Sequence, residues 1–255
     1  MTATRANPES DLRNLTHALQ AGYVATWRAA RRFARTTGLL GALDRRYRRA
    51  PRGPLAHART LFAIHDAEDL MELDVPWWTY RATSEVERFL ARLGGGARVF
   101  EFGSGASTVW LARRSAKVVS VEHHAGFAAV VRRELAARDL DSRVELLLVE
   151  PVHSERPATP SRRRNERDTD FTDYAATIGR VGGEFDLISV DGRARAACLA
   201  AALPHLAEGG VVVFDDSQRP RYREALERSG LAVHRHRGLA PSLPYPRETS
   251  VLSAR

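Results

Sequence analysis

Cysteine is almost absent from this chain of 255 residues, since Cys198 is the only one. A single cysteine excludes an intrachain disulfide and a cysteine-based metal cluster. Long apolar runs are also missing, and none approaches the roughly 18–20 residues that a membrane-spanning helix needs. The first residues, MTATRANPESD, lack the basic and then apolar pattern of a secretory signal peptide. We therefore expect a cytoplasmic protein without a transmembrane segment.

Lysine is nearly as scarce, because Lys117 is the only lysine and arginine supplies the rest of the 39 basic residues. They outnumber the 31 acidic residues, which gives a formal net charge of +8 at pH 7. A basic chain raises the question of a nucleic acid or another polyanion as partner. Arginine and alanine dominate throughout the chain, which is typical of a GC-rich coding bias, so nucleic acid is the less favoured partner.

Residues 1–75 have the pattern of a helical extension. Apolar residues recur at helical spacing from Leu12 onwards, and Gly38, Gly41 and the stretch 51–54 divide the pattern into separate helices. We interpret a basic face on one helix as exposed to solvent. Docking to a membrane surface or to a partner, including a homo-oligomer formed through these helices, is the alternative. The arginines of this face are spaced three or four positions apart: Arg28, Arg31, Arg32 and Arg35.

Residues 76–255 show a regular alternation of strands and helices. Continuous apolar strands joined by helices indicate a parallel sheet covered on both faces, so the predicted fold class is α/β and doubly wound. A polar, arginine-rich stretch, 157–170, is predicted to be a mobile loop. The predicted strands are 98–102, 118–122, 144–149, 185–190 and 211–214, followed by the late pair 231–237 and 249–253.

The segment from Val99 to Glu122 has the pattern of a ligand-binding site. Its first strand runs directly into the turn Gly103-Ser104-Gly105, and a helix follows. Glycine permits backbone conformations closed to other residues and lets a ligand lie against the chain. The second strand ends in Glu122, 17 positions after Gly105, where an acid can accept hydrogen bonds from both hydroxyls of a ribose. In an open parallel sheet this turn lies where a ligand is expected.

Dinucleotide oxidoreductases use a similar strand, glycine turn and ribose-binding acid. Their third glycine would fall at Thr108 and is absent here, whereas an acid, Glu101, precedes the first glycine. With these features the chain resembles the class I S-adenosylmethionine (SAM)-dependent methyltransferases, whose first motif reads acid-x-G-x-G. The resemblance implies a seven-stranded, mostly parallel sheet of order 3-2-1-4-5-7-6, with SAM bound in a domain of residues 76–255.

The same resemblance implies roles for individual residues. Gly103 and Gly105 would flank the amino-acid part of SAM. Glu101 would orient its ammonium group, and Glu122 would bind the ribose. The remaining cofactor-binding candidates lie on the same segment: Ser104, Ser107 and His123.

Acidic residues also follow two later strands. The fourth predicted strand ends at Asp191, and the fifth ends at Asp215 and Asp216. Three carboxylates that point into one crevice suit a hard cation such as Mg²⁺. The arrangement is similar to catechol-type and macrolide-sugar O-methyltransferases, in which such acids hold a divalent metal that positions hydroxyl groups. The alternative is that Asp191 contacts the cofactor or caps a helix while the other two acids form a turn.

Transfer to a hydroxyl of high pKa requires a general base. Catechol-type enzymes place a lysine shortly after the fourth-strand acid, whereas this chain has Arg193 and Arg195, which stay protonated. The candidate catalytic residues are therefore Asp191 and His123. Because His123 directly follows Glu122, it is expected either to pack on the adenine or to move a proton.

The sequence therefore predicts a SAM-dependent methyltransferase acting on a small molecule, with a hydroxyl oxygen as the expected acceptor. The N/D-P-P-Y/F motif of nucleobase amino-group methylation is absent after the fourth strand, where the chain reads Ser189-Val190-Asp191-Gly192. Two alternatives stay open. One is an RNA methyltransferase that binds the phosphates of RNA through the basic N-terminal helices. The other is a non-catalytic methyltransferase-like scaffold.

Overall fold

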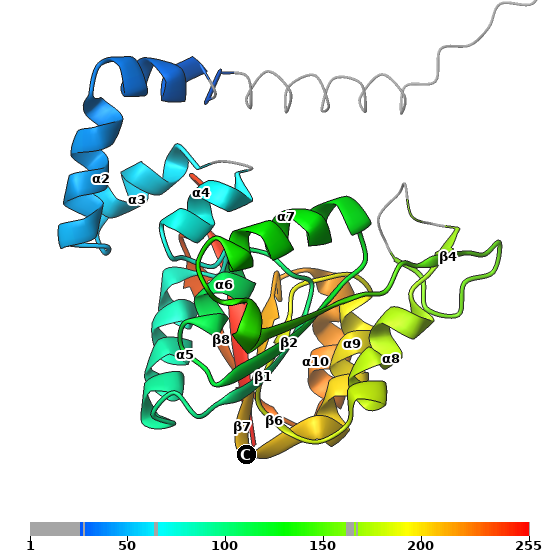
Figure 1. The fold of residues 1–255 in the computed structure, drawn as a ribbon. Coiled ribbons are helices and arrows are strands. Elements are labelled where there is room, and N and C mark those ends of the chain that lie inside the picture. The colour runs from blue at the N-terminus through cyan, green and yellow to red at the C-terminus, as the bar shows by residue number, and fades with distance from the viewer. Residues whose placement is uncertain (1–25, 28, 64–65, 162–165, 167, 255) are drawn as a thin grey trace, which may run out of the picture. The chain divides into compact units, whose positions relative to one another are not determined.

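The computed structural model describes residues 26–27, 29–63, 66–161, 166 and 168–254, and the chain divides into two compact units, Met1–Asp66 and Ala67–Arg255 (Figure 1). The division falls before the boundary at residue 75 that the sequence suggested. Helix α4 (Ala67–Glu72) contacts α6 (Ala106–Ala112) of the second unit, and the α4 residue Leu70 is completely buried. The predicted helical positions from Leu12 to residue 25, and Arg28 of the basic face, lie outside the described residues.

The described part of the first unit is helical, which confirms the predicted extension over these residues. It consists of a helix over residues 29–36, α2 (Leu39–Arg49) and α3 (Pro54–Leu61). Gly38, whose φ is +75°, separates the first two helices, because glycine adopts this left-handed conformation without strain. An ion pair of 2.5 Å between Arg59 Nε and Asp44 Oδ1 joins α3 to α2.

The second unit is built on a seven-stranded sheet of order β3-β2-β1-β6-β7-β9-β8. The strands from β3 to β7 in this order are parallel, while β9 is antiparallel to both β7 and β8. Because β4 and β5 form a separate pair, the order of the seven sheet strands is 3-2-1-4-5-7-6, as predicted. The strands are β1 (Arg98–Phe102), β2 (Lys117–Glu122), β3 (Val144–Leu148), β6 (Phe185–Val190), β7 (Leu206–Asp215), β8 (Ala232–Gly238) and β9 (Arg247–Ser253).

Helices cover both faces of this sheet, which explains why its central strands are continuous apolar runs (Figure 1). The helices α5, α6 and α7 pack on one face, and α8, α9 and α10 pack on the other. No helix among the described residues has both the length and the apolar character to cross a bilayer. The helix bounds are α5 (Tyr80–Arg92), α7 (Ala125–Ala136), α8 (Thr172–Val181), α9 (Arg195–Ala202) and α10 (Arg223–Arg228).

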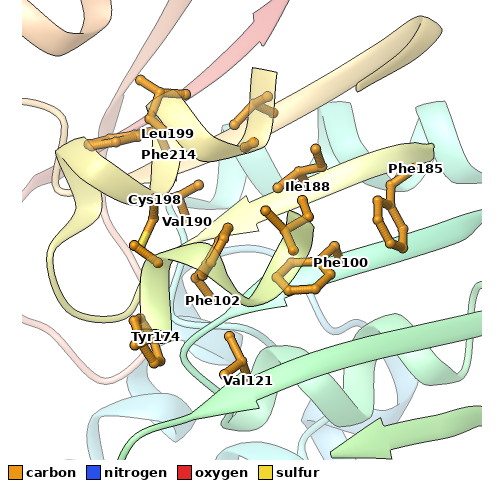
Figure 2. Close-up of a cluster of buried hydrophobic side chains, with 14 of the residues drawn as sticks. Phe100, Phe102, Val121, Tyr174, Phe185, Ile188, Val190, Cys198, Leu199 and Phe214 are labelled. Carbon is orange, nitrogen blue, oxygen red and sulfur yellow. The ribbon is translucent and has the colours of Figure 1, made fainter. Parts of the chain in front are cut away.

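An aromatic core fills the space between the sheet and the helices α8 to α10. Phe100 and Phe102 of β1 lie beside Phe185 and Tyr174, and all four side chains are buried (Figure 2). Cys198 of α9 is completely buried in the same cluster, and burial raises the pKa of its thiol. The core therefore fixes the central strands, whose ends carry the residues discussed below.

The polar stretch 157–170, predicted to be a mobile loop, is anchored at its end. β4 (Val152–His153) pairs with β5 (Thr169–Asp170) in an antiparallel ladder. The Asp170 carboxylate accepts hydrogen bonds from the backbone N–H groups of Ala158, at 2.6 Å, and Thr172, at 2.8 Å. Two-residue strands leave no periodic signal, so only the tertiary structure could reveal this pair.

Candidate active site

A contact between two glycines joins the ends of β1 and β6. Gly103 follows β1 with φ +94°, and its N–H donates to Val121 O of β2 at 2.9 Å. A Cβ at Gly103 would lie 2.5 Å from the Cα of Gly192, which follows β6. The N–H of Asp191 donates to Phe102 O at 3.0 Å. The two turns therefore touch through their backbones at the point where the strand order reverses, which is where ligands bind in doubly wound sheets.

Gly105, unlike Gly103, has no close backbone neighbour at its Cβ position. Its backbone is extended, and a Cβ there would meet nothing closer than Cε1 and Cζ of Phe127 at 4.0 Å. The N–H of Gly105 donates to Thr108 Oγ1 at 2.8 Å, which holds the start of α6. An added Cβ would therefore make only an ordinary van der Waals contact, so packing within the protein does not require glycine at position 105. Close approach of a ligand, which the sequence analysis expects to be the amino-acid part of SAM, is a reason for glycine at this position.

Glu101 lies completely buried beneath the turn and accepts three hydrogen bonds from hydroxyl groups. The donors are Ser107 Oγ at 2.5 Å, Thr108 Oγ1 at 2.5 Å and Ser120 Oγ at 2.7 Å. Burial raises the pKa of Glu101 to about 7, although the three hydroxyl donors oppose the rise. Both carboxylate oxygens of Glu101, and the hydroxyl of Ser107, therefore hold the turn together. Ser120 was missed by the sequence reasoning, although a lone polar residue in an apolar strand is a visible signal.

Glu122 ends β2 and is bonded to the same turn. The N–H and Oγ of Ser104 donate to Glu122 Oε2 at 3.2 and 3.0 Å, and the His124 N–H donates to Oε1 at 2.9 Å. Burial acts to raise the pKa of Glu122, but its hydrogen bonds and the neighbouring His123 bring the pKa below the ordinary value. Glu122 is therefore held ionised and in place, which is the state needed to accept bonds from ribose hydroxyls.

His123 follows Glu122 directly, just after the end of β2. Its Nδ1 is 2.8 Å from Glu122 Oε1, and its ring lies 5.8 Å from the ring of Phe171 and 6.1 Å from that of Tyr174, measured between centroids. β2 and β6 flank β1 on opposite sides, so His123 and Asp191 leave the sheet on opposite sides of the glycine turn. The structure therefore places His123 beside Glu122, a candidate cofactor-binding residue, and separates it from the acids that follow β6 and β7.

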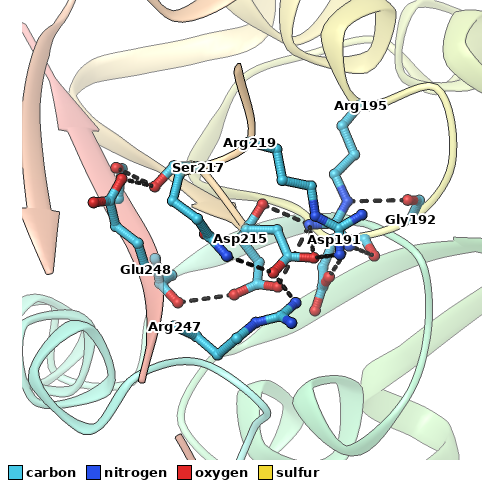
Figure 3. A network of polar contacts seen from close by, with 12 residues as sticks. Asp191, Gly192, Arg195, Asp215, Ser217, Arg219, Arg247 and Glu248 are labelled. Atoms are coloured by element: carbon cyan, nitrogen blue, oxygen red, sulfur yellow. Dashed lines mark hydrogen bonds and ion pairs between the residues drawn. The ribbon is translucent and has the colours of Figure 1, made fainter. Parts of the chain in front are cut away.

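The three strand-end acids come together as predicted, but three arginines form ion pairs with them. Figure 3 shows Asp191 and Asp215 near these arginines, which are Arg195, Arg219 and Arg247. Asp216 forms ion pairs with Arg219 and Arg247, and its Oδ2 lies 3.8 Å from Arg195 Nη1. Asp215 lies 3.4 Å from the same Arg195 nitrogen. Sequence reasoning missed Arg247 entirely, because it stands at the start of β9 and reaches the site only through the antiparallel pairing of β9 with β7.

Arg195 also holds Asp191. Its Nη2 lies 2.7 Å from Asp191 Oδ1, and its Nε donates to Gly192 O at 3.1 Å. Burial and the neighbouring charge of Asp215 raise the pKa of Asp191 to about 8, while Arg195 opposes the rise. The carboxyl group of Asp191 is therefore far more basic than an ordinary aspartate, and it lies beside the glycine contact.

Comparison with known proteins agrees with this geometry. Residues 100–217 match the family described as a methyltransferase domain, a range that begins in β1 and ends beyond Asp216. The chain therefore contains a methyltransferase domain. No curated protein matches its sequence.

Solved structures share the fold of this methyltransferase. An O-methyltransferase from Bacillus cereus in complex with S-adenosylhomocysteine (SAH) is 16% identical with a TM-score of 0.54, and the match covers 91% of this chain and 100% of that one. The O-methyltransferase TomG from Streptomyces achromogenes, in complex with SAM, is 19% identical with a TM-score of 0.51, covering 80% and 92%. At these identities the likeness shows that this methyltransferase shares their fold.

The three acids of the predicted magnesium site are surrounded by arginines. Mg²⁺ needs carboxylate oxygens that are free to coordinate it. Here Arg195 contacts Asp191, Asp215 and Asp216, and two further guanidinium groups contact Asp216. Within the described residues, no three metal-ligating side chains are arranged to hold an ion. The guanidinium groups already neutralise the acids, so these residues do not fit a divalent cation.

We expect methyl transfer by this enzyme to be indifferent to chelators. After EDTA treatment and buffer exchange, turnover should stay within about twofold of the untreated value, because Arg195 and its neighbours supply the positive charge that a metal would supply. The measurement is transfer of a labelled methyl group from SAM. A loss of turnover that added Mg²⁺ restores would contradict this expectation.

Proposed function

We propose that this methyltransferase transfers the methyl group of SAM to a hydroxyl oxygen of a small molecule, and that Asp191 accepts the hydroxyl proton. The observation that carries the proposal is the position of Asp191, a partly buried carboxyl group at the strand switch point, next to the glycine turn. The names of the similar structures from Bacillus cereus and Streptomyces achromogenes, both O-methyltransferases, support oxygen as the acceptor.

In this proposal some residues bind the methyl donor and Asp191 accepts the proton. Bound SAM supplies an electrophilic methyl group. Glu122 and the backbone at Gly105 bind and orient the donor, and alignment of donor and acceptor provides most of the acceleration. Arg195 holds the Asp191 carboxyl in one orientation through its 2.7 Å contact. Asp191 then takes the proton as the acceptor oxygen attacks, which its raised pKa favours.

The first experiment is a search for the acceptor with methyl-labelled SAM. Phenols, sugars, amines and carbon acids are offered in parallel to the purified protein. Transfer to hydroxyl compounds supports oxygen methylation, and transfer to amines or carbon acids alone rejects it. A protein that binds SAH and transfers a methyl group to none of them would favour the non-catalytic scaffold.

Asp191→Asn should lower kcat by at least about 100-fold with the best hydroxyl acceptor, because asparagine cannot accept the proton. SAH affinity, measured by calorimetry, should remain within a few-fold of wild type. The kcat of the wild type should rise as pH increases toward and past about 8, where Asp191 loses its proton, and this rise should vanish in the variant.

His123→Asn is the matched comparison, because His123 is the other candidate base. Its ring contacts Glu122 and an aromatic pair, so this variant should raise the KM for SAM and leave the pH dependence of kcat in place. The reverse pattern, in which His123→Asn removes the pH dependence and Asp191→Asn keeps it, would assign the base to His123.

A further inference from the structure

The net positive charge of the protein comes from its first unit. Met1–Asp66 holds 12 arginines and 4 acidic residues, whereas Ala67–Arg255 holds the other 27 basic residues and exactly as many acidic ones. The whole net charge of +8 therefore belongs to the first 66 residues, and the methyltransferase unit is neutral. A coding bias toward arginine acts on both units alike and does not explain why acids are so few in the first.

Most arginines of the first unit are exposed. Its two described acids, Asp44 and Asp66, are already paired with Arg59 and Arg31. Both arginines are less exposed than the other described arginines of the unit. Six of them lie on the surface of the helix over 29–36 and of α2: Arg32, Arg35, Arg45, Arg46, Arg48 and Arg49.

Large apolar side chains are exposed in the same unit, one on each of its three helices. Phe33, between Arg32 and Arg35, is 68% exposed. Leu39, the first residue of α2, is 49% exposed, and Leu55 of α3 is 54% exposed. Exposed apolar side chains interspersed with exposed arginines are typical of helices that lie in the headgroup region of a bilayer.

We infer that the first unit binds the surface of an anionic phospholipid bilayer. Its guanidinium groups would contact lipid phosphates, and Phe33, Leu39 and Leu55 would enter the boundary between headgroups and acyl chains. RNA fits the unit less well, because the two leucines offer neither charge for phosphates nor an aromatic face for bases. A second copy of the chain fits less well too, because two units of charge +8 repel each other.

The test is co-sedimentation of the full-length protein with vesicles at about 0.1 M salt. Vesicles containing about 30% phosphatidylglycerol in phosphatidylcholine should bind at least about tenfold more protein than pure phosphatidylcholine vesicles. Binding should fall as salt is raised, because the attraction is electrostatic. Equal binding to both kinds of vesicle, or to neither, would overturn the inference.

Two variants locate the surface. Replacing Arg45, Arg46, Arg48 and Arg49 by glutamine should lower binding to the anionic vesicles about tenfold or more. Phe33→Ser, which changes no charge, should also lower it. In the matched control, four exposed arginines of the second unit are replaced by glutamine and binding should be unchanged: Arg81, Arg88, Arg92 and Arg223. SAH calorimetry and circular dichroism confirm that each variant is folded.

A single-stranded RNA of about 30 nucleotides is the competing probe. The inference holds if the RNA binds more weakly than the anionic vesicles and Phe33→Ser weakens vesicle binding. It is overturned if the RNA binds more tightly and the four-arginine variant loses it, since the surface would then serve nucleic acid. It is equally overturned if the control variant of the second unit loses vesicle binding as strongly as the variant of α2.

Discussion

Gly103→Ala should lower the free energy of unfolding by about 3–5 kcal/mol and abolish SAH binding. An alanine Cβ would lie 2.5 Å from Gly192 Cα and 2.7 Å from Gly192 N, and both are backbone atoms that cannot rotate away. Alanine is also strained at the φ of +94° found here. The ends of β1 and β6 would have to separate, and with them the floor of the site. Urea denaturation and calorimetry with SAH measure the two effects.

Gly182→Ala is the control for this variant. Gly182 has a φ of +70°, so alanine is strained there too, but no atom lies within 4 Å of the Cβ position. The loss of stability should therefore be only about 1–2 kcal/mol, with SAH binding intact. Equal losses in the two variants would show that backbone strain, and not the contact with Gly192, makes glycine necessary at position 103.

Gly105→Ala separates the cofactor contact from the fold. Its Cβ would meet protein atoms only at 4.0 Å, and its extended backbone accepts any residue, so stability should be unchanged. SAH affinity should nevertheless fall by about tenfold or more, because the new methyl group would occupy the space we assign to the cofactor. Unchanged affinity would place the amino-acid part of SAM elsewhere.

Glu122→Ala should weaken SAH binding by about 100-fold or more, as measured by calorimetry. The variant removes the carboxylate assigned to both ribose hydroxyls, and hydrogen bonds to a charged acceptor contribute more than neutral ones. It also removes the acceptor of the bonds from Ser104 and His124 that shape the turn. Glu122→Gln, which keeps the shape but not the charge, should lie between the variant and the wild type.

Glu145→Ala is the matched control, because Glu145 is an exposed glutamate on the neighbouring strand β3. Its SAH affinity should equal that of the wild type. Undiminished binding in Glu122→Ala would reject the ribose assignment. It would leave Glu122 as a residue that only supports the turn.

The sequence by itself determined the sheet and the location of the cofactor turn. Both depend on short-range signals: the apolar runs that become β1, β2 and β6, the glycines at 103 and 105, and the acid at the end of β2. The sequence also placed Asp191, Asp215 and Asp216 at one edge, because the carboxyl ends of parallel strands meet there. These features follow from patterns a few residues long, and the tertiary structure confirms the fold they predict.

Only the tertiary structure decided what surrounds those acids. Arg247 is 31 residues away from Asp216 and reaches it because β9 returns antiparallel to β7, a pairing that carries no local signal. The partner of Ser120 was also decided by the tertiary structure, because its hydroxyl donates to Glu101 across two neighbouring strands. The net charge could be assigned to the first unit only because the structure divides the chain at residue 66. Charges act through space, so their partners are known only once distant segments have been brought together.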